Sequence, residues 1–405
     1  MRGGVEVKAC GPDELLPALT PVWHYFGATP TPESSMRIAR FIAPGRAHAA
    51  RMDGEVVGGA SAFSFELTVP GARLPSAGVA AVAALPTHRR RGILRSLMRA
   101  QLDDVHERGE PLAVLWASDE RIYGRYGYGV ASLAGEMNLP RVRASLRGPA
   151  EPVGQARLVS LEEARAAFPD IYERVAAETP GMYARSEDWW DLRVLADPPE
   201  RRAGGGELVR VLVEIGGRPE GYALYRIHQS FEHGFSIGHA RVLEAMGTSA
   251  DATREVWRVL LGVDWVDRIT ASLLPIDHAL FFLLEEPRRM TLRVGDGIWL
   301  RLVDVGAALG ARSYRGGEPA VLDVQDDFCP WNAGRWKVDA ANVGRSDEEP
   351  DVHCDVSELG SVFLGGFTFA QLAAAGRARE LRARGLARAD ALFRTDRAPW
   401  CPEIF

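Results

Sequence analysis

One stretch decides the fold of this chain: residues 78–95, which read GVAAVAALPTHRRRGILR. The run of small apolar side chains at 78–85 is typical of a buried strand, and Pro86 ends it. After a short basic turn, a helical pattern begins at Gly92 and continues to about Glu107. The first N–H groups of such a helix are free, and together with the helix dipole they favour an anion such as a pyrophosphate. The stretch therefore predicts an anion-binding loop, with a solvated basic helix start as the simpler alternative.

The elements around this stretch favour a mixed α/β fold. Helical patterns cover 14–19 and 33–42, and two strands flank Asp53-Gly54, a dipeptide typical of hairpins. A second apolar strand at 112–117 follows the helix and leads into a Gly/Tyr-rich segment at 123–129. Strand, loop, helix and strand in this order predict a βαβ crossover.

The order of elements recurs further along the chain, which predicts three domains at 1–150, 151–304 and 305–405. Residues 141–155 are rich in Pro and Gly and are expected to be a linker. The second unit is expected to contain helices at 161–177, 186–195, 250–261 and 277–285, and strands at 208–214, 221–227, 236–243, 268–274 and 298–303. Gly247-Thr248-Ser249 replaces the arginine turn there. The third unit is expected to combine strands at 320–324, 336–339 and 352–356 with helices at 369–377 and 379–393.

Composition excludes several classes of function. A formal net charge of −6 argues against a general binder of nucleic acid or anionic membranes. The longest run of small apolar residues, 77–85, is too short to span a bilayer. The 4 cysteines are scattered and no apolar leader is found, so we expect a reduced cytoplasmic protein. Lys8 and Lys337 are the only lysines, which nearly excludes an enzyme that needs a reactive lysine.

Two motifs carry a resemblance to a known family. Residues 89–94 read RRRGIL, close to the Arg/Gln-x-x-Gly-x-Gly/Ala coenzyme A loop of GCN5-related N-acetyltransferases (GNATs), with Leu94 in the last small position. Together with IYGRYGYG at 122–129 and a C-terminal phenylalanine, this sequence resembles the enhanced-intracellular-survival (Eis) acetyltransferases over its whole length.

The resemblance implies two tandem GNAT domains and a C-terminal sterol-carrier-like α+β domain, assembled as a homohexamer. It implies that the first domain alone binds acetyl-CoA and that no metal is needed. Carried over to matching positions, the cofactor contacts are Val82, Ala83, Ala84, Arg90, Arg91, Gly92, Ile93, Leu94, Arg95, Ser118 and Asp119.

Acetyl transfer to an amine needs a base for the ammonium proton and an acid for the leaving thiolate. Tyr123 follows the second apolar strand and is the predicted acid, with Tyr126 and Tyr128 as rivals and aromatic packing as the structural alternative. In the family the base is the C-terminal carboxylate, which here belongs to Phe405. His88 is a weaker candidate for the base.

The expected acceptor is an amine, in a pocket whose predicted walls are Trp23, Trp116, Trp190 and Asp296. In the best-studied members the penultimate residue is acidic, whereas here it is Ile404, and Trp116 replaces a smaller polar ring. Aminoglycoside-like polyamines and lysine side chains are therefore alternative acceptors. A non-catalytic protein that binds an apolar ligand in its C-terminal domain is the alternative function. His353-Cys354-Asp355 is a poor metal motif, because strand neighbours face opposite sides.

Overall fold

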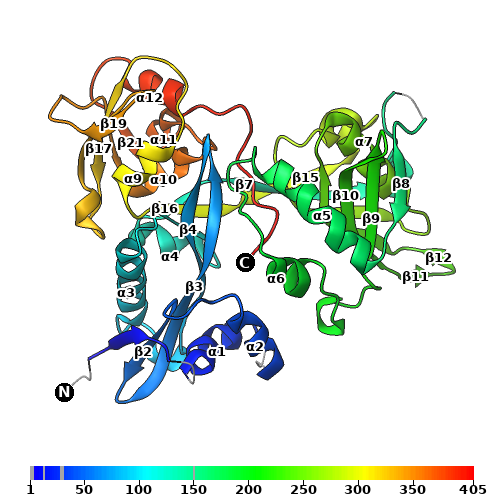
Figure 1. The fold of residues 1–405 in the computed structure, drawn as a ribbon, viewed down its shortest axis with the longest axis horizontal. Coiled ribbons are helices and arrows are strands. Elements are labelled where there is room, and N and C mark those ends of the chain that lie inside the picture. Colours follow the sequence, from blue (N-terminus) through cyan, green and yellow to red (C-terminus); the bar gives the residue numbers. More distant parts are fainter. Residues whose placement is uncertain (1–3, 12–13, 28–31, 149–150) are drawn as a thin grey trace. The chain divides into compact units, whose positions relative to one another are not determined.

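The computed structural model describes residues 4–11, 14–27, 32–148 and 151–405, and contacts divide the chain into two units. The first unit holds residues 1–132, 298–396 and 404–405, and the second holds residues 133–297 and 397–403. Within the described ranges, each unit contains a mixed seven-stranded sheet with helices packed on it, and the first unit also holds a five-stranded sheet (Figure 1). The mixed α/β class predicted from the sequence is confirmed.

The first sheet is built around a parallel pair of strands, β4 and β5, joined by helix α3. Its order is β1 (Glu6–Ala9), β2 (Ala47–Met52), β3 (Glu55–Val69), β4 (Ala72–Ala84), β5 (Leu112–Trp116), β16 (Ile298–Leu302) and β6 (Gly129–Val130). The helices of this part are α1 (Leu15–Tyr25), α2 (Pro32–Ala39), α3 (Ile93–Glu107) and α4 (Glu120–Tyr123).

Local sequence explains the hairpin and the crossover helix. Asp53 and Gly54 have φ values of 51° and 86°, the left-handed pair that a two-residue turn between β2 and β3 favours. Helix α3 buries Ile93, Leu97 and Val105 among other apolar residues, at the spacing of one helical face. The expected βαβ crossover is therefore present.

Helix α1 differs from the prediction. The sequence predicted a helix at 14–19, but α1 continues through Pro21 to Tyr25. Proline is disfavoured inside a helix because it lacks an N–H donor, so the pattern alone predicted too short an element. The added turn matters, since it brings further apolar side chains to the cavity described below.

The second unit repeats the arrangement of the first. Its sheet has the order β15 (Thr291–Asp296), β7 (Leu133–Pro140), β14 (Arg268–Leu274), β13 (His239–Gly247), β10 (Arg218–His228), β9 (Val209–Ile215) and β8 (Gln155–Leu158), beside a small hairpin of β11 (Phe231–Glu232) and β12 (Phe235–Ser236). Its helices are α5 (Leu161–Ala176), α6 (Glu187–Trp189), α7 (Ala250–Leu261) and α8 (Leu280–Leu283). Strands β13 and β14 are parallel and α7 joins them, as α3 joins β4 and β5.

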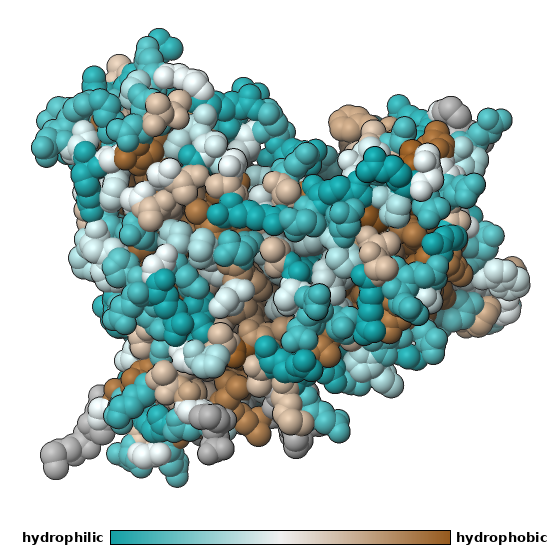
Figure 2. All heavy atoms as spheres, in the orientation of Figure 1, coloured by the Kyte–Doolittle hydropathy of each residue, from teal (hydrophilic) through white to brown (hydrophobic). Residues whose placement is uncertain are grey.

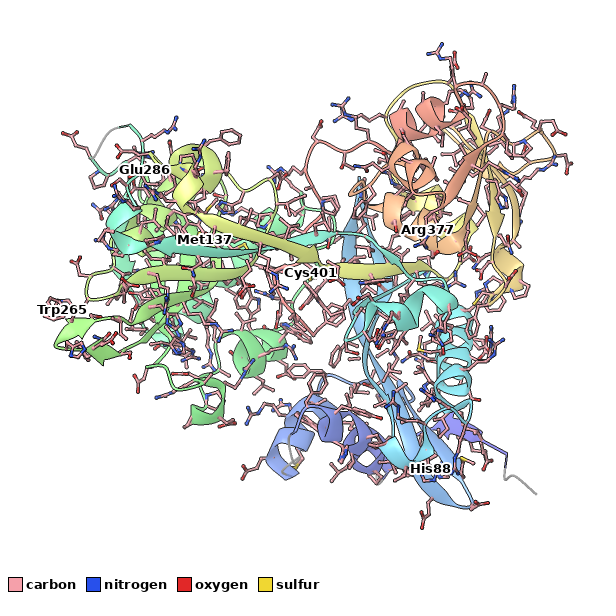
Figure 3. All side chains as sticks on the ribbon, turned by 180° about the vertical axis from the view of Figure 1, so that it is seen from behind. His88, Met137, Trp265, Glu286, Arg377 and Cys401 are labelled. Carbon is pink, nitrogen blue, oxygen red and sulfur yellow. The ribbon has the colours of Figure 1, made fainter. Side chains whose placement is uncertain are left out.

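Two strands cross the domain boundaries expected from the sequence. Strand β7 lies before residue 150 but pairs with β14 and β15 in the second sheet, and β16 lies before residue 305 but pairs with β5 and β6 in the first. Met137, labelled in Figure 3, belongs to β7 and is fully buried in the hydrophobic core of the second unit. Each sheet is thus completed by a strand from the sequence region assigned to the other, because strand pairing is a long-range property that local patterns do not specify.

The third sheet belongs to the first unit. Its order is β19 (Val343–Arg345), β18 (Gly334–Val338), β17 (Ala320–Gln325), β20 (Val352–Asp355) and β21 (Ala378–Glu380), with helices α9 (Val305–Ala311), α10 (Val356–Phe363), α11 (Phe369–Ala374) and α12 (Gly385–Phe393). The expected helix at 379–393 is wrong in its first part. Residues 378–380 instead pair with β20, and α12 starts only after Arg384, which has a left-handed φ of 63°.

Two glycines let α10 pack closely on the first sheet. A Cβ on Gly129 would lie 1.8 Å from the carbonyl oxygen of Ser357, and a Cβ on Gly360 would lie 2.3 Å from that of Leu300. A buried ion pair between Arg301 of β16 and Asp326, 2.7 Å apart, also joins the two sheets. These contacts explain why the C-terminal region and the first sheet form one unit.

None of the helices in the described part of the chain is long and apolar enough to cross a membrane. Figure 2 shows mainly hydrophilic residues on the face seen there, with hydrophobic residues in smaller patches.

The packing of α10 gives a first prediction. Gly129→Ala should lower the free energy of unfolding by about 1–3 kcal/mol, because the new methyl group overlaps a backbone carbonyl that cannot move freely. Chemical denaturation measures this change. The matched control is Gly344→Ala, also in a strand, where the structure shows nothing within 4 Å of the new atom. Equal stabilities for the two variants would contradict the packing described here.

Candidate functional site

The site begins where two parallel strands separate. Strands β4 and β5 pair from Ser76↔Leu112 to Gly78↔Val114, and β4 then continues to Ala84 without further pairing to β5. On its other side β4 stays paired with β3 but contains a bulge, at which Ala81 has a φ of 54°. The bulge turns β4 away from its parallel neighbour. Backbone of the second half of β4 therefore faces an opening in the sheet.

A basic loop continues from this opening to α3. The turn Pro86–His88 is followed by Arg90, with a φ of 60°, and by Gly92, with a φ of 86°. Gly92 is needed for this left-handed backbone, which L side chains adopt only under strain. Helical bonding starts with Ser96 N donating to Gly92 O, so the N–H groups of the first turn point out of the helix end. The exposed arginines of this loop add positive charge at the same place.

A cavity of about 720 Å³, here called the α3 cavity, joins the opening to the loop. All the residues predicted to contact the cofactor except Arg91 line it: Val82, Ala83, Ala84, Arg90, Gly92, Ile93, Leu94, Arg95, Ser118 and Asp119. Arg91 is exposed on the same loop. The cavity combines an apolar slot along β4 with a basic rim, which fits a ligand made of a slender chain and a pyrophosphate.

Sequence reasoning missed part of this lining. Val22, Tyr25 and Phe26 reach the cavity from the end of α1, beyond Leu19, where the predicted helix ends. His88, Arg89, Ile122, Arg125 and Tyr126 complete it. The spacing of Val22 and Phe26, four residues apart, was the available signal.

The tyrosines after β5 lie in different surroundings. Tyr123 ends α4, which is capped by the Asp119 carboxylate accepting from Arg121 N at 3.0 Å. The residue is 6% exposed, and burial raises the pKa of its phenol despite a hydrogen bond with Ser118. The phenol therefore keeps its proton at neutral pH. Tyr126 lines the α3 cavity directly and its pKa is also raised by burial, whereas Tyr128 is fully buried.

The last residue of the chain packs on β3. The ring of Phe405 meets the ring of Phe65 edge-on, with centroids 4.9 Å apart, and lies 6.5 Å from that of Phe63. The ring of Phe65 in turn covers Gly78, where a Cβ would lie 2.1 Å from it. Since Gly78 is the last residue of β4 that pairs with β5, the chain's C-terminal residue packs beside the point where the strands separate.

The predicted pocket walls are distributed over both units. In the first unit, Trp23 is half-buried on α1 and Trp116 is half-buried at the end of β5. In the second, Asp296 is exposed at the end of β15, and Trp190 is 4% exposed in the core, where it meets Tyr172 edge-on at 5.6 Å.

The other histidine candidates have local partners. His88, labelled in Figure 3, closes the turn before α3 by donating its backbone N–H to Leu85 O, and its Nδ1 lies 2.9 Å from the Thr87 hydroxyl. His353 Nδ1 lies 2.8 Å from a carboxylate oxygen of Asp323 on the neighbouring strand. Across the described residues, no group of three His, Cys, Asp or Glu side chains could hold a metal ion.

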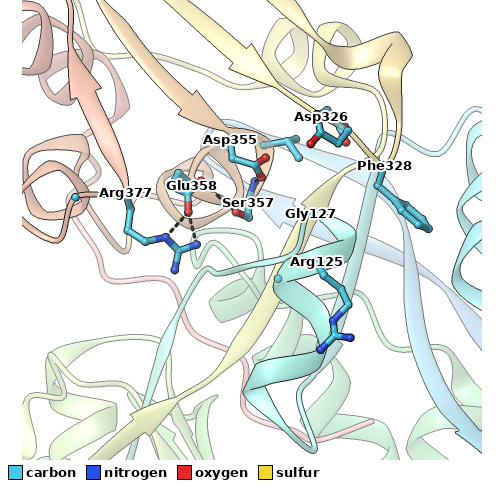
Figure 4. A pocket seen from close by; sticks show the side chains of 12 residues that line it. Arg125, Gly127, Asp326, Phe328, Asp355, Ser357, Glu358 and Arg377 are labelled. Carbon is cyan, nitrogen blue, oxygen red and sulfur yellow. Dashed lines mark hydrogen bonds and ion pairs between the residues drawn. The ribbon is translucent and has the colours of Figure 1, made fainter. Parts of the chain in front are cut away.

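A second cavity of the first unit, of about 490 Å³, lies beside the third sheet (Figure 4). Its charged lining comes from Asp326, Asp327, Asp355, Glu358, Arg125 and Arg377. The Nε of Arg377 donates to the Glu358 carboxylate at 2.7 Å, and burial raises the pKa of that carboxyl. A cavity lined in this way suits polar ligands better than apolar ones.

Comparison with known proteins gives consistent matches along the chain. Family models described as an acetyltransferase (GNAT) domain match residues 7–131 and 181–302, and one described as a sterol carrier protein domain matches residues 305–402. An uncharacterized N-acetyltransferase of Streptomyces coelicolor is 40% identical over 87% of each chain. N-acetyltransferase Eis of Mycobacterium tuberculosis is 36% identical over 84% of each chain. The crystal structure of Eis1 from Mycobacterium abscessus superposes with a TM-score of 0.86 at 35% identity, covering 99% of this chain and 100% of the other.

Proposed function

The chain belongs to the Eis family of GCN5-related N-acetyltransferases, and from this premise we propose that its first domain transfers an acetyl group from acetyl-CoA to an amine at the α3 cavity. The observation that carries the proposal is the separation of β4 from β5 next to a basic loop. The open half of β4 would hold the extended arm of the coenzyme, and the loop and the first turn of α3 would hold its phosphates.

Acetyl-CoA supplies the acetyl group as a thioester, and the chain's own groups would do the rest. Backbone N–H groups of β4 would polarise the thioester carbonyl, as an oxyanion hole does. Tyr123, protonated at neutral pH, would donate a proton to the sulfur of the leaving group. The carboxylate of Phe405 would take the proton from the ammonium group, directly or through water.

The second GNAT-like domain lacks the basic loop and would not bind acetyl-CoA, while the sterol-carrier-like domain would supply the C-terminal segment. All four cysteines are free, which supports a reducing cytoplasm. The assembly would be a homohexamer, as the family resemblance implies. Trp23, Trp116, Trp190 and Asp296 stay candidate walls for an aminoglycoside-like or lysine-like amine.

The alternative function, binding of an apolar ligand by the C-terminal domain without catalysis, has less support. The cavity beside the third sheet is lined by carboxylates and arginines, which would lose hydration against a sterol-like ligand.

The function is tested by measuring release of coenzyme A with acetyl-CoA and a panel of amines, including an aminoglycoside and a lysine peptide. Arg90→Gln should weaken binding of acetyl-CoA about tenfold in calorimetry, because one charge-assisted contact to phosphate is lost. The matched control is Arg293→Gln, a surface arginine of the second unit whose side chain is 85% exposed. Absence of micromolar acetyl-CoA binding by the unaltered protein would overturn the proposal.

The acid is tested separately. Tyr123→Phe should lower kcat roughly 10²-fold, with an unchanged KM for acetyl-CoA, because proton donation to the thiolate is lost while the α3 cavity is intact. Tyr314→Phe removes a half-buried phenol of the first unit that donates to Leu309 O, and it serves as the control in steady-state assays. Full turnover by Tyr123→Phe, with loss in Tyr126→Phe, would move the role to Tyr126.

The base is tested by lengthening the chain. One glycine added after Phe405 moves the carboxylate by about 3.8 Å and should lower kcat at least tenfold. Phe405→Leu keeps the carboxylate at its place in the chain and should retain more activity than the lengthened chain. If the added residue changes nothing, the C-terminal carboxylate is not the base.

A further inference from the structure

The second unit contains a counterpart of the α3 cavity. Strands β13 and β14 pair from His239↔Arg268 to Val242↔Ala271, after which β13 continues to Gly247 without further pairing to β14. A cavity of about 770 Å³, here called the α7 cavity, is lined by the same succession of elements as the α3 cavity: the end of the first strand, the following loop, the start of the helix and the segment after the second strand. Its residues in that order include Met246, Gly247, Thr248, Ser249, Pro275 and Asp277.

The loop of the α7 cavity is already bonded to a carboxylate of the chain. The hydroxyl of Thr248 donates to the Glu220 carboxylate, and Arg174 Nη1 donates to the same carboxylate at 2.9 Å. The backbone N–H of Thr248 donates to the backbone carbonyl of Glu220. The hydrogen bond from Thr248 is the largest contribution that lowers the pKa of Glu220, so the carboxylate is charged at neutral pH. The charged lining of the α7 cavity is thus mixed, with Glu178, Glu220 and Asp277 beside Arg174 and Arg397. Its loop offers phosphates no arginine, unlike the loop of the first unit.

Trp400, in the C-terminal segment of residues 397–403, lies at the separation of β13 from β14, where it lines the α7 cavity together with Arg397 and Ala398. Trp400 packs in the core of the second unit with Met246, donates its indole N–H to Leu273 O on β14, and donates its backbone N–H to Pro180 O at 2.8 Å. Gly181, with a φ of 95°, allows this approach, because a Cβ there would lie 2.9 Å from Trp400 O. The ring is 8% exposed. Part of the chain's own C-terminal segment therefore lines the cavity that corresponds to the α3 cavity, and its indole bonds to β14 there.

Three residues later, a single carboxylate fixes the segment. Glu403 accepts from Arg193 Nε at 2.6 Å, Trp189 Nε1 at 2.8 Å, Tyr183 Oη at 3.0 Å and Arg185 Nη2 at 3.1 Å. Burial raises the pKa of Glu403, but attraction to the two arginines and these hydrogen bonds outweigh it and leave the pKa below its usual value. Arg185 is itself buried and also binds Glu244 at 2.6 Å, so the group is a closed ionic network.

Phe405 follows Glu403 by two residues. Its ring packs on Phe65 of the first unit, whereas Glu403 belongs to the second. Two residues of chain span at most about 7 Å, so fixing Glu403 strongly limits where the terminal carboxylate can go. Cys401, labelled in Figure 3, stiffens this segment further by donating its thiol to Glu403 O.

We propose that the second GNAT-like domain does not bind the coenzyme and instead uses the α7 cavity to hold the chain's own C-terminal segment. Trp400 and Glu403 are then positioning residues for the Phe405 carboxylate. This inference rests on the proposed function, in which that carboxylate is the base.

The test uses the full chain at a temperature well below unfolding and compares Glu403→Gln with the unaltered protein. The variant should lose at least tenfold in kcat and keep its KM for acetyl-CoA, because the terminal carboxylate is misplaced while the α3 cavity is unchanged. Glu255→Gln is the matched control: this carboxylate is also buried in the second unit, pairs with Arg258 at 2.6 Å and accepts from Val153 N at 3.2 Å. It should lower the melting temperature and keep kcat.

The decisive measurement combines Glu403→Gln with one glycine added after Phe405. If Glu403 acts through the terminal carboxylate, the double variant is no slower than the lengthened chain alone. If Glu403 only stabilises the fold, its effect multiplies with that of the extension, and the inference is wrong. Should Glu403→Gln fail to fold, Trp400→Phe, which loses the indole hydrogen bond and keeps an aromatic ring, replaces it in the same cycle.

The outcomes separate this inference from the function on which it rests. An unaltered protein that releases no coenzyme A with any amine refutes the proposed function. An active protein whose kcat is insensitive to both Glu403→Gln and Trp400→Phe refutes the positioning role alone.

Discussion

The separation of two parallel strands is the constraint on which the rest of this structure depends. Hydrogen bonding between β4 and β5 stops at Gly78, and the bulge at Ala81 turns the end of β4 away from its neighbour. Such a gap leaves backbone groups of a central strand without a strand partner, which is costly unless something else meets them. In the first unit the gap opens into a cavity beside a basic loop. In the second, it opens into the α7 cavity, and Trp400 of the C-terminal segment lines that cavity and bonds to β14.

The separation of two parallel strands thus leads to a different site in each unit, because a few residues near it differ. The first unit has arginines and a left-handed glycine before its helix, which favour an anionic ligand. The second has Thr248 in its loop, bonded to Glu220, and an indole in its slot. The strand exchange of β7 and β16 ties the two sheets into one chain path, so neither sheet is complete without sequence assigned to the other domain.

Local signals predicted the elements with strong periodicity. The helix at 250–261 and the strand at 268–274 have the predicted bounds, since an amphipathic helix and an apolar strand each show their buried face in the sequence. Strand β15 was missed because most of its residues are exposed, and β21 because it has three residues. The sequence of β7 shows the alternation of a strand, with Met137 and Leu139 buried between the exposed Glu136 and Asn138. This alternation does not indicate which sheet the strand joins.

The candidate site shows the same limit of sequence reasoning. The loop from Arg90 to Arg95 was readable because its residue types are contiguous and their chemistry is local. The role of Glu403 could not be predicted from the sequence, because its four hydrogen-bond donors lie more than 200 positions earlier in the chain. A carboxylate near a chain end is normally solvated, and only the fold shows that this one meets two arginines, an indole and a phenol. For that reason a terminal segment that local pattern would leave frayed is instead fixed to the second unit through Trp400 and Glu403.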